Sequence, residues 1–148
     1  MSTLCRLLAG LAILVAPAAS QAGTISYQSG SEQQVLALLN QIRQQHRLVR
    51  LTLSTPLRGA ARAHSLDMLQ NGYFDHTADE TSGTRGETIA WGVGSYGTPS
   101  GLVSQWMHSA PHRAVILAPD MRRVGIGVAL GTFGTTRNAV LATADFSG

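Results

Sequence analysis

The spacing of the apolar residues changes near residue 123, and this change constrains the fold more than any other feature of the sequence. Before it, apolar residues recur at helical spacing, whereas residues 124–130 alternate between branched apolar and small side chains. Residues 138–146 form a second extended run, and residues 131–134 are predicted to join the two runs as a hairpin. Helices followed by an antiparallel ribbon predict an α+β fold rather than a wound parallel sheet.

The first helix is predicted over residues 31–47. Ser31 and Gln34 have the spacing of a capping box, in which a serine oxygen and a glutamine side chain satisfy backbone amides of the first turn. Val35 and Leu39 follow at helical spacing and are expected in the core.

Two further helices are predicted from proline and glycine signals. Thr55-Pro56 and Thr98-Pro99 each supply an N-cap residue followed by a proline at the first helical position. Gly72 ends the second helix, and Pro111 interrupts the third. The glycine-rich and polar segments between these elements are predicted to be loops.

The N-terminal segment has the layout of a signal peptide. Arg6 precedes an apolar stretch over residues 7–19, which is shorter than the roughly 20 residues that a membrane-spanning helix needs. Cleavage after Ala22 fits best, and a permanent anchor is the weaker alternative. We therefore expect a signal peptide over 1–22, a flexible lead-in over 23–30 and a domain over 31–148, secreted or periplasmic, with no membrane span after cleavage.

Charge argues against a nucleic-acid partner. The formal net charge is +3 and all 11 cationic residues are arginines, but these are scattered along the chain, and the longest basic run is Arg122-Arg123. Nucleic-acid binding needs a clustered cationic face, so we expect no nucleic acid among the partners. The single cysteine, Cys5, lies in the predicted signal peptide, so the exported chain would have no disulfide.

Two of the five histidines are predicted to have structural roles. His46 lies at the end of the first helix, where the helix dipole favours an imidazolium. His64 lies on the apolar stripe of the second helix, which is more typical of a core histidine than of a ligand.

His108 and His112 are four residues apart, as in zinc peptidases with an H-E-x-x-H motif. Ser109 occupies the glutamate position, and Pro111 breaks the helix that would align the pair, so this mechanism is disfavoured. A Ser109 and His112 nucleophile pair is equally weak, because no G-x-S-x-G turn is present.

His76, Glu87 and His112 are the stronger candidates for chemistry. Each lies in a segment punctuated by glycine or proline, next to a predicted helix or strand. Two imidazoles and one carboxylate are the ligands of an open divalent-metal site, if the fold brings them together. Zn²⁺ or another divalent metal is the expected cofactor.

The chain resembles the CAP superfamily, whose domain is also called the SCP domain. The motifs that carry the resemblance occur in order over about residues 31–146: Asn40-Gln41-Ile42-Arg43, Ala61-Arg62-Ala63-His64 with Met68, Phe74-Asp75-His76, Gly86-Glu87-Thr88-Ile89-Ala90, Trp106-Met107-His108-Ser109-Ala110-Pro111-His112-Arg113 and Val124-Gly125-Ile126-Gly127. Cysteine-rich secretory proteins, venom antigens and plant pathogenesis-related proteins belong to this superfamily. The absence of disulfides makes this chain similar to bacterial members.

The resemblance implies an α-β-α sandwich with a small antiparallel sheet and a cleft lined by two histidines and two acidic residues. Its motifs place the histidines at His76 and His112 and the first acid at Glu87. Ser109 stands where eukaryotic relatives have the second acid, and Thr88 stands where the family usually has asparagine. The resemblance thus implies a cleft lined by these residues, with Ser109 and Thr88 beside the metal-ligand candidates.

Several interpretations of this cleft stay open. Glu87 either binds a metal or accepts a hydrogen bond from a histidine and locks the loops to the sheet. The main functional hypothesis is a non-enzymatic binding module without catalytic residues. The alternatives are a hydrolase that uses a zinc-bound water, and a lipid-binding module of the cell envelope whose ligand is unknown.

Overall fold

A computed structural model gives the fold over residues 24–77 and 85–148. The predicted signal peptide and part of the loop after the second helix lie outside these described residues. The elements, in chain order, are β1 (Ser26–Tyr27), α1 (Ser29–Gln45), β2 (Thr52–Leu53), α2 (Thr55–Asn71), β3 (Gly86–Gly92), the 3₁₀ helix η1 (Gly94–Gly97), α3 (Pro99–His108), α4 (Ala110–Ile116), β4 (Arg123–Phe133) and β5 (Thr136–Ser147).

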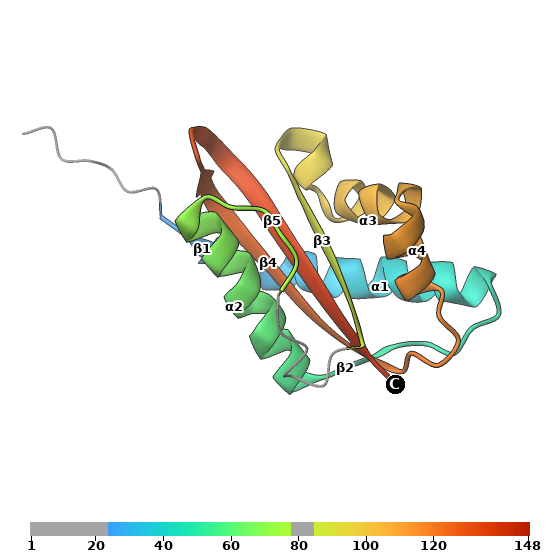
Figure 1. Cartoon of the computed structure of the whole chain (residues 1–148). Helices are drawn as coiled ribbons and strands as arrows, with labels where there is room; N and C mark the ends of the chain where they lie inside the picture. Colours follow the sequence, from blue (N-terminus) through green and yellow to red (C-terminus); the bar gives the residue numbers. More distant parts are fainter. Residues whose placement is uncertain (1–23, 78–84) are drawn as a thin grey trace, which may run out of the picture.

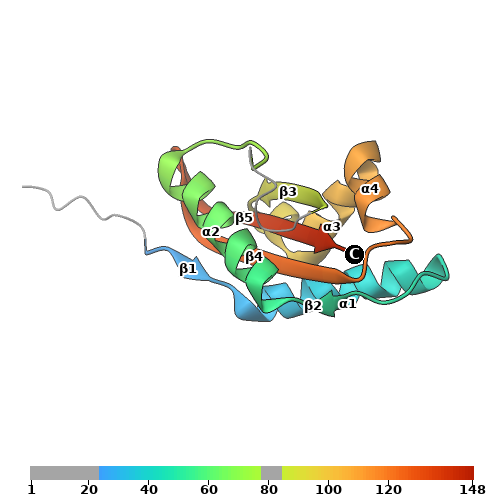
Figure 2. The same cartoon turned by 60° about the horizontal axis from the view of Figure 1, so that its bottom comes forward.

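The sheet is built around the β4–β5 ribbon that the alternating sequence predicts. Its strand order is β1-β4-β5-β3, all antiparallel, and the short β2 pairs in parallel with the start of β4. The helix α2 lies along one face of this sheet, and α1, α3 and α4 lie on the other (Figures 1 and 2). The predicted α+β class and α-β-α sandwich are confirmed.

The face toward α1 and α3 carries the main hydrophobic core. Val124, Ile126 and Val128 of β4 point to this face and pack with Trp106 of α3 and Phe146 of β5. All five side chains are fully buried. Because large apolar side chains of the sheet and of the helix layer meet here, this face supplies most of the burial that holds the sandwich together.

The face toward α2 is built differently, because glycines let the helix approach the sheet closely. An added Cβ at Gly125 would lie 1.9 Å from the backbone carbon of Leu57, and one at Gly127 would lie 2.4 Å from that of Ala61. Both distances are far below van der Waals contact, so α2 can pack against β4 only because these positions are glycines.

Glu32 connects α1 to α2. Its side chain is 3% exposed and accepts hydrogen bonds from Arg58 and Arg62 at distances down to 2.7 Å. Burial raises the pKa of Glu32, but the hydrogen bonds and charges of the two arginines outweigh this effect and lower it overall. The pairing fixes the position of α2, which carries His64, against the start of α1.

Three boundary predictions are wrong. The segment 26–30 is not a flexible lead-in, because β1 pairs with β4 and α1 begins at Ser29. The capping box is not formed, because Ser31 lies inside the helix and Gln28 occupies the cap without a side-chain hydrogen bond. The hairpin turn lies one to three residues later than predicted, since β4 continues to Phe133 and pairs there with Thr136.

The other helix signals are confirmed with small shifts. Thr98 caps α3 by accepting a hydrogen bond from the Gly101 amide at 3.1 Å, and Gly72 ends α2 in the left-handed conformation with a φ of 69°. Ser54, rather than Thr55, is the cap residue of α2. Pro111 separates α3 from α4 and lies in the first turn of α4. Within the described residues, no helix has the length and apolar character needed to cross a membrane.

Candidate functional site

His76 and Glu87 meet where the loop after α2 crosses the start of β3. The His76 Nδ1 atom lies 2.7 Å from Glu87 Oε1, and an ionised carboxylate at this distance accepts the Nδ1 proton. The His76 side chain is half exposed and that of Glu87 is 10% exposed. Glu87 therefore fixes the orientation of a solvent-accessible imidazole.

His112 approaches the opposite side of the His76 ring from α4. The two Nε2 atoms are 3.4 Å apart, and the rings are inclined at 60°. Two nitrogens bound to one tetrahedral zinc ion, each at about 2.0 to 2.1 Å, are separated by about 3.3 to 3.4 Å. The histidine pair thus has the nitrogen spacing of two ligands of a single ion.

Glu87 is fully engaged by the loop. Its Oε1 also accepts the Thr77 backbone amide at 3.0 Å, and its Oε2 accepts the Thr77 hydroxyl at 2.6 Å. The carboxylate lies on the Nδ1 side of His76, whereas His112 lies on the Nε2 side. Of the two interpretations left open by the sequence, the geometry supports the one in which Glu87 accepts a hydrogen bond and locks the loop.

His64 belongs to this cluster, although the sequence assigned it to the core. Its Nε2 atom lies 3.0 Å from the Asp75 carbonyl oxygen and 3.7 Å from Glu87 Oε2. The side chain is 11% exposed. The prediction that His64 is a structural histidine is right in that it binds the backbone, but its contact is to the site loop and not to the apolar core.

Asp145 is a second residue that sequence reasoning missed. It lies directly opposite Glu87 in the β3–β5 pairing and is 5% exposed. Burial, and to a lesser extent the charge of Glu87, raise the pKa of Asp145 to about 7. The site therefore contains two acidic residues after all, but the second one comes from β5 and not from the position of Ser109.

The electrostatics of His112 favour a neutral ring. Burial and the neighbouring His76 lower its pKa, and Glu87 opposes this effect without overcoming it. A neutral imidazole is the form that binds metals. Among residues 24–77 and 85–148, no group of three or more histidine, cysteine or acidic side chains is arranged to hold a metal ion.

The family model for the cysteine-rich secretory protein family, CAP, matches residues 36–146, which is most of the chain. The chain belongs to the CAP family. Two relatives from Bacillus subtilis (strain 168) match parts of this CAP domain. The uncharacterized membrane protein YlbC is 32% identical over 114 residues, and the uncharacterized protein YkwD is 35% identical over 112 residues.

This CAP chain is much shorter than those relatives. The matches cover 68% and 67% of the chain but only 32% of YlbC and 42% of YkwD. An extracellular protein with an SCP domain from Bacillus anthracis has a similar crystal structure, with a TM-score of 0.60 and 21% identity over 80% of this chain and 41% of that one. At this identity the similarity supports the fold alone.

Of the two predicted cleft residues of the CAP domain, Thr88 faces away from the histidine pair, and the Ser109 side chain makes no cap hydrogen bond to α4. Thr88 alternates with Glu87 along β3, so its side chain points to the opposite face of the sheet and is fully buried. Ser109 caps α4 with its backbone carbonyl, which accepts the Arg113 amide at 2.9 Å. Ser109 is thus positioned by the α3–α4 junction, next in sequence to the helix that presents His112.

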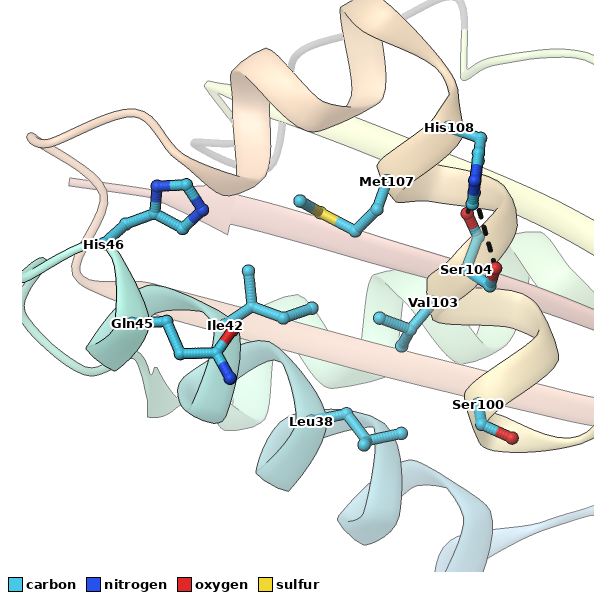
Figure 3. Close-up of a pocket in the computed structure, with 9 residues that line it drawn as sticks. All are labelled: Leu38, Ile42, Gln45, His46, Ser100, Val103, Ser104, Met107 and His108. Carbon is cyan, nitrogen blue, oxygen red and sulfur yellow. Dashed lines mark hydrogen bonds between the residues drawn. The ribbon is translucent and has the colours of Figure 1, made fainter.

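The other two histidines line a separate groove of the CAP domain, between α1 and α3. His46 follows the end of α1, and His108, the last residue of α3, lies 2.8 Å through Nδ1 from the Ser104 carbonyl oxygen. The groove has a volume of about 370 Å³, and Figure 3 shows Leu38 and Ile42 facing Val103 and Met107 across it. Its walls are mainly apolar, with polar groups at the ends.

Proposed function

We propose that this CAP domain is a non-enzymatic binding module of the cell exterior or periplasm that holds a divalent metal ion, zinc in the first instance, between His76 and His112. The 3.4 Å separation of their Nε2 atoms carries the proposal. Both rings can present a nitrogen lone pair, because Glu87 fixes the proton of His76 on Nδ1 and the lowered pKa keeps His112 neutral.

Glu87 would hydrogen-bond to the ligand His76 and would not bind the metal itself. A carboxylate that accepts the far ring proton of a ligating histidine fixes its tautomer and increases its basicity. The remaining coordination positions would be open to water or to a donor atom of the bound partner.

A binding role is favoured over hydrolysis by the state of the carboxylates. A zinc-bound water needs a general base within hydrogen-bonding reach, and both oxygens of Glu87 are already engaged by His76 and Thr77. Asp145 is buried on the sheet beside Glu87. The Glu87 carboxylate is therefore not free to activate a water at the histidine pair, and burial limits the access of water to Asp145.

Zinc titration calorimetry on the full chain tests this proposal. We expect His112→Ala to abolish specific binding and His108→Ala, which removes an exposed histidine of the other groove, to leave it unchanged. Glu87→Gln should weaken binding by about 10- to 100-fold, the usual effect of removing an orienting partner. Equal affinity of the His112→Ala and His108→Ala variants would overturn the proposal.

A second candidate function, lipid binding, is favoured by the groove between α1 and α3. Its apolar walls suit an acyl chain, and the groove is independent of the histidine pair. The affinity for a fluorescent fatty acid, checked by its displacement with an unlabelled fatty acid, should fall in Leu38→Gln. It should be unchanged in Leu53→Gln, since Leu53 is an exposed leucine of β2 outside the groove. Equal displacement from both variants would exclude this groove as the lipid site.

A further inference from the structure

The fold gathers arginines that are scattered in the sequence. Arg47 and Arg50 lie on the connection from α1 to β2, Arg85 immediately precedes β3, and Arg122 and Arg123 lie at the start of β4. All five are exposed. Figure 1 shows β2, the start of β3, the start of β4 and the end of β5 at the same end of the sheet, which we call the arginine end.

Contacts tie these segments to one another. The Arg123 Nη2 atom donates to the Gly148 carbonyl at 2.7 Å, and a Cβ built on Gly148 would lie 2.5 Å from Arg85 Nη1. The Thr52 amide, two residues after Arg50, donates to the Arg122 carbonyl at 2.9 Å. Four of the arginines therefore belong to directly connected segments.

A sixth arginine, Arg43, lies beneath this end and holds its backbone segments in place. It is fully buried and donates to the carbonyls of Val49, Ile116, Ala118 and Met121 at 2.7 to 3.0 Å. Val49 lies on the connection that carries Arg47 and Arg50, Ile116 is the last residue of α4, and Ala118 and Met121 lie on the connection that leads to Arg122 and Arg123. One buried side chain thus fixes both cationic segments.

The positive charge of this end is poorly neutralised. On residues 46–53, 85–86, 117–123 and 147–148, five exposed arginines face a single acidic residue, Asp120, which is itself exposed and lies 3.3 Å from Arg85. The pKa of Arg43 is lowered by burial and then by Arg122, and Asp120 only partly offsets these effects. The surplus charge is available to an anionic partner.

We propose that the arginine end binds the headgroup phosphates of an anionic phospholipid bilayer. Guanidinium groups bind phosphate through paired hydrogen bonds, and each cation near an anionic membrane contributes separately to adsorption. A nucleic acid is the less suitable polyanion. No exposed phenylalanine, tyrosine or tryptophan lies on the segments of this end that the structure describes, so no large aromatic ring is available to stack on bases.

Co-sedimentation of the full chain with vesicles tests the proposal. Vesicles of equal parts phosphatidylglycerol and phosphatidylcholine are compared with pure phosphatidylcholine vesicles, whose binding is subtracted because it includes any contribution of the N-terminal apolar segment. The test variant is Arg47→Gln with Arg50→Gln, since neither side chain has a hydrogen bond to another described residue. The control is Arg137→Gln, an exposed arginine on β5 near the β4–β5 turn.

We expect binding to anionic vesicles to fall by about fivefold for each arginine removed from the arginine end, and to weaken as salt is raised. Arg137→Gln should change it by less than about twofold. Equal losses per charge at the two places would show a general charge effect and overturn the proposal. Tighter binding to duplex DNA or soluble polyphosphate than to the vesicles would overturn the assignment to a lipid surface.

Discussion

The two faces of the sheet are stabilised by different means. Toward α1 and α3, branched and aromatic side chains of β4, β5 and α3 fill the interlayer space. Toward α2, the sheet presents Gly125 and Gly127, and polar side chains such as Thr143, Asp145 and Glu87 follow on β5 and β3. The face toward α1 and α3 holds the larger apolar core. The α2 face combines close backbone contact and polar side chains with a smaller apolar cluster that includes Met68, Ile89 and Leu141, and the ionisable site lies at its edge.

This difference explains why the carboxylates of β3 and β5, Glu87 and Asp145, both lie on the α2 face. Ser65 of α2 lies 2.9 Å from the Thr143 hydroxyl and 3.0 Å from the Gly127 carbonyl, so polar groups on the α2 face satisfy one another. On the apolar face, the Thr88 hydroxyl and the Trp106 indole nitrogen are buried without a hydrogen-bond partner among the described residues. The Thr143 hydroxyl is therefore accommodated on the α2 face, whereas the unpartnered Thr88 hydroxyl costs free energy on the other face.

The largest effect is expected from filling the close contact under α2. Gly125→Ala should lower the free energy of unfolding by more than about 4 kcal/mol, because the new methyl group would overlap the Leu57 backbone. Gly59→Ala is the control within α2, since nothing lies within 4 Å of an added Cβ there, and it should stabilise by about 0.5 to 1 kcal/mol. Denaturant unfolding followed by circular dichroism measures both; a loss below about 1 kcal/mol at Gly125 would refute the close packing.

Asp145→Asn should change how stability depends on pH. The pKa of Asp145 is about 7 in the folded protein against an ordinary 3.8, so between these values the folded state keeps a proton that the unfolded state has lost. This residue therefore makes stability fall as pH rises from about 4 to 7, and the asparagine variant lacks that fall. We expect the variant to gain about 2 kcal/mol relative to the parent between pH 4 and pH 8, after discounting the full shift for relaxation. A difference between the two proteins that does not vary with pH would contradict this account of Asp145.

The gathering of His76, Glu87 and His112 could be predicted from the order of the motifs, and the helices and the ribbon from apolar spacing and proline signals. His64 and Asp145 could not. Periodicity places His64 on the buried side of α2 without showing that this side faces a polar cluster. Asp145 lies in an extended apolar run, and only the strand register places it beside Glu87.

The sequence wrongly placed Thr88 in the cleft and did not reveal the arginine end, for related reasons. A one-residue step along β3 separates the two faces, so the family motif that contains Glu87 and Thr88 does not show which of them faces the cleft. Arginines far apart in sequence meet because the segments that carry them lie at the same end of the sheet, which no local pattern records.

A matched pair of isosteric substitutions would sharpen the comparison of the faces. Thr143→Val removes a hydroxyl that is hydrogen-bonded to Ser65 and should destabilise the protein by about 1 to 2 kcal/mol. The measurement is the midpoint and slope of urea unfolding. Unchanged stability would mean that the polar pair on the α2 face contributes nothing.

Thr88→Val should have the opposite sign and the smallest effect. It replaces a fully buried, unpartnered hydroxyl with a methyl group of the same shape, so we expect a gain of up to about 1 kcal/mol under the same conditions. Destabilisation by Thr88→Val similar to that by Thr143→Val would remove the distinction between the faces.

A crystal structure of the protein with zinc is the most direct test of the proposed metal site between His76 and His112. The account predicts one ion within about 2.0 to 2.1 Å of the Nε2 atoms of both His76 and His112, with Glu87 still accepting the Nδ1 proton of His76. An ion bound by the Glu87 carboxylate, or one found only at another place on the molecule, would contradict it.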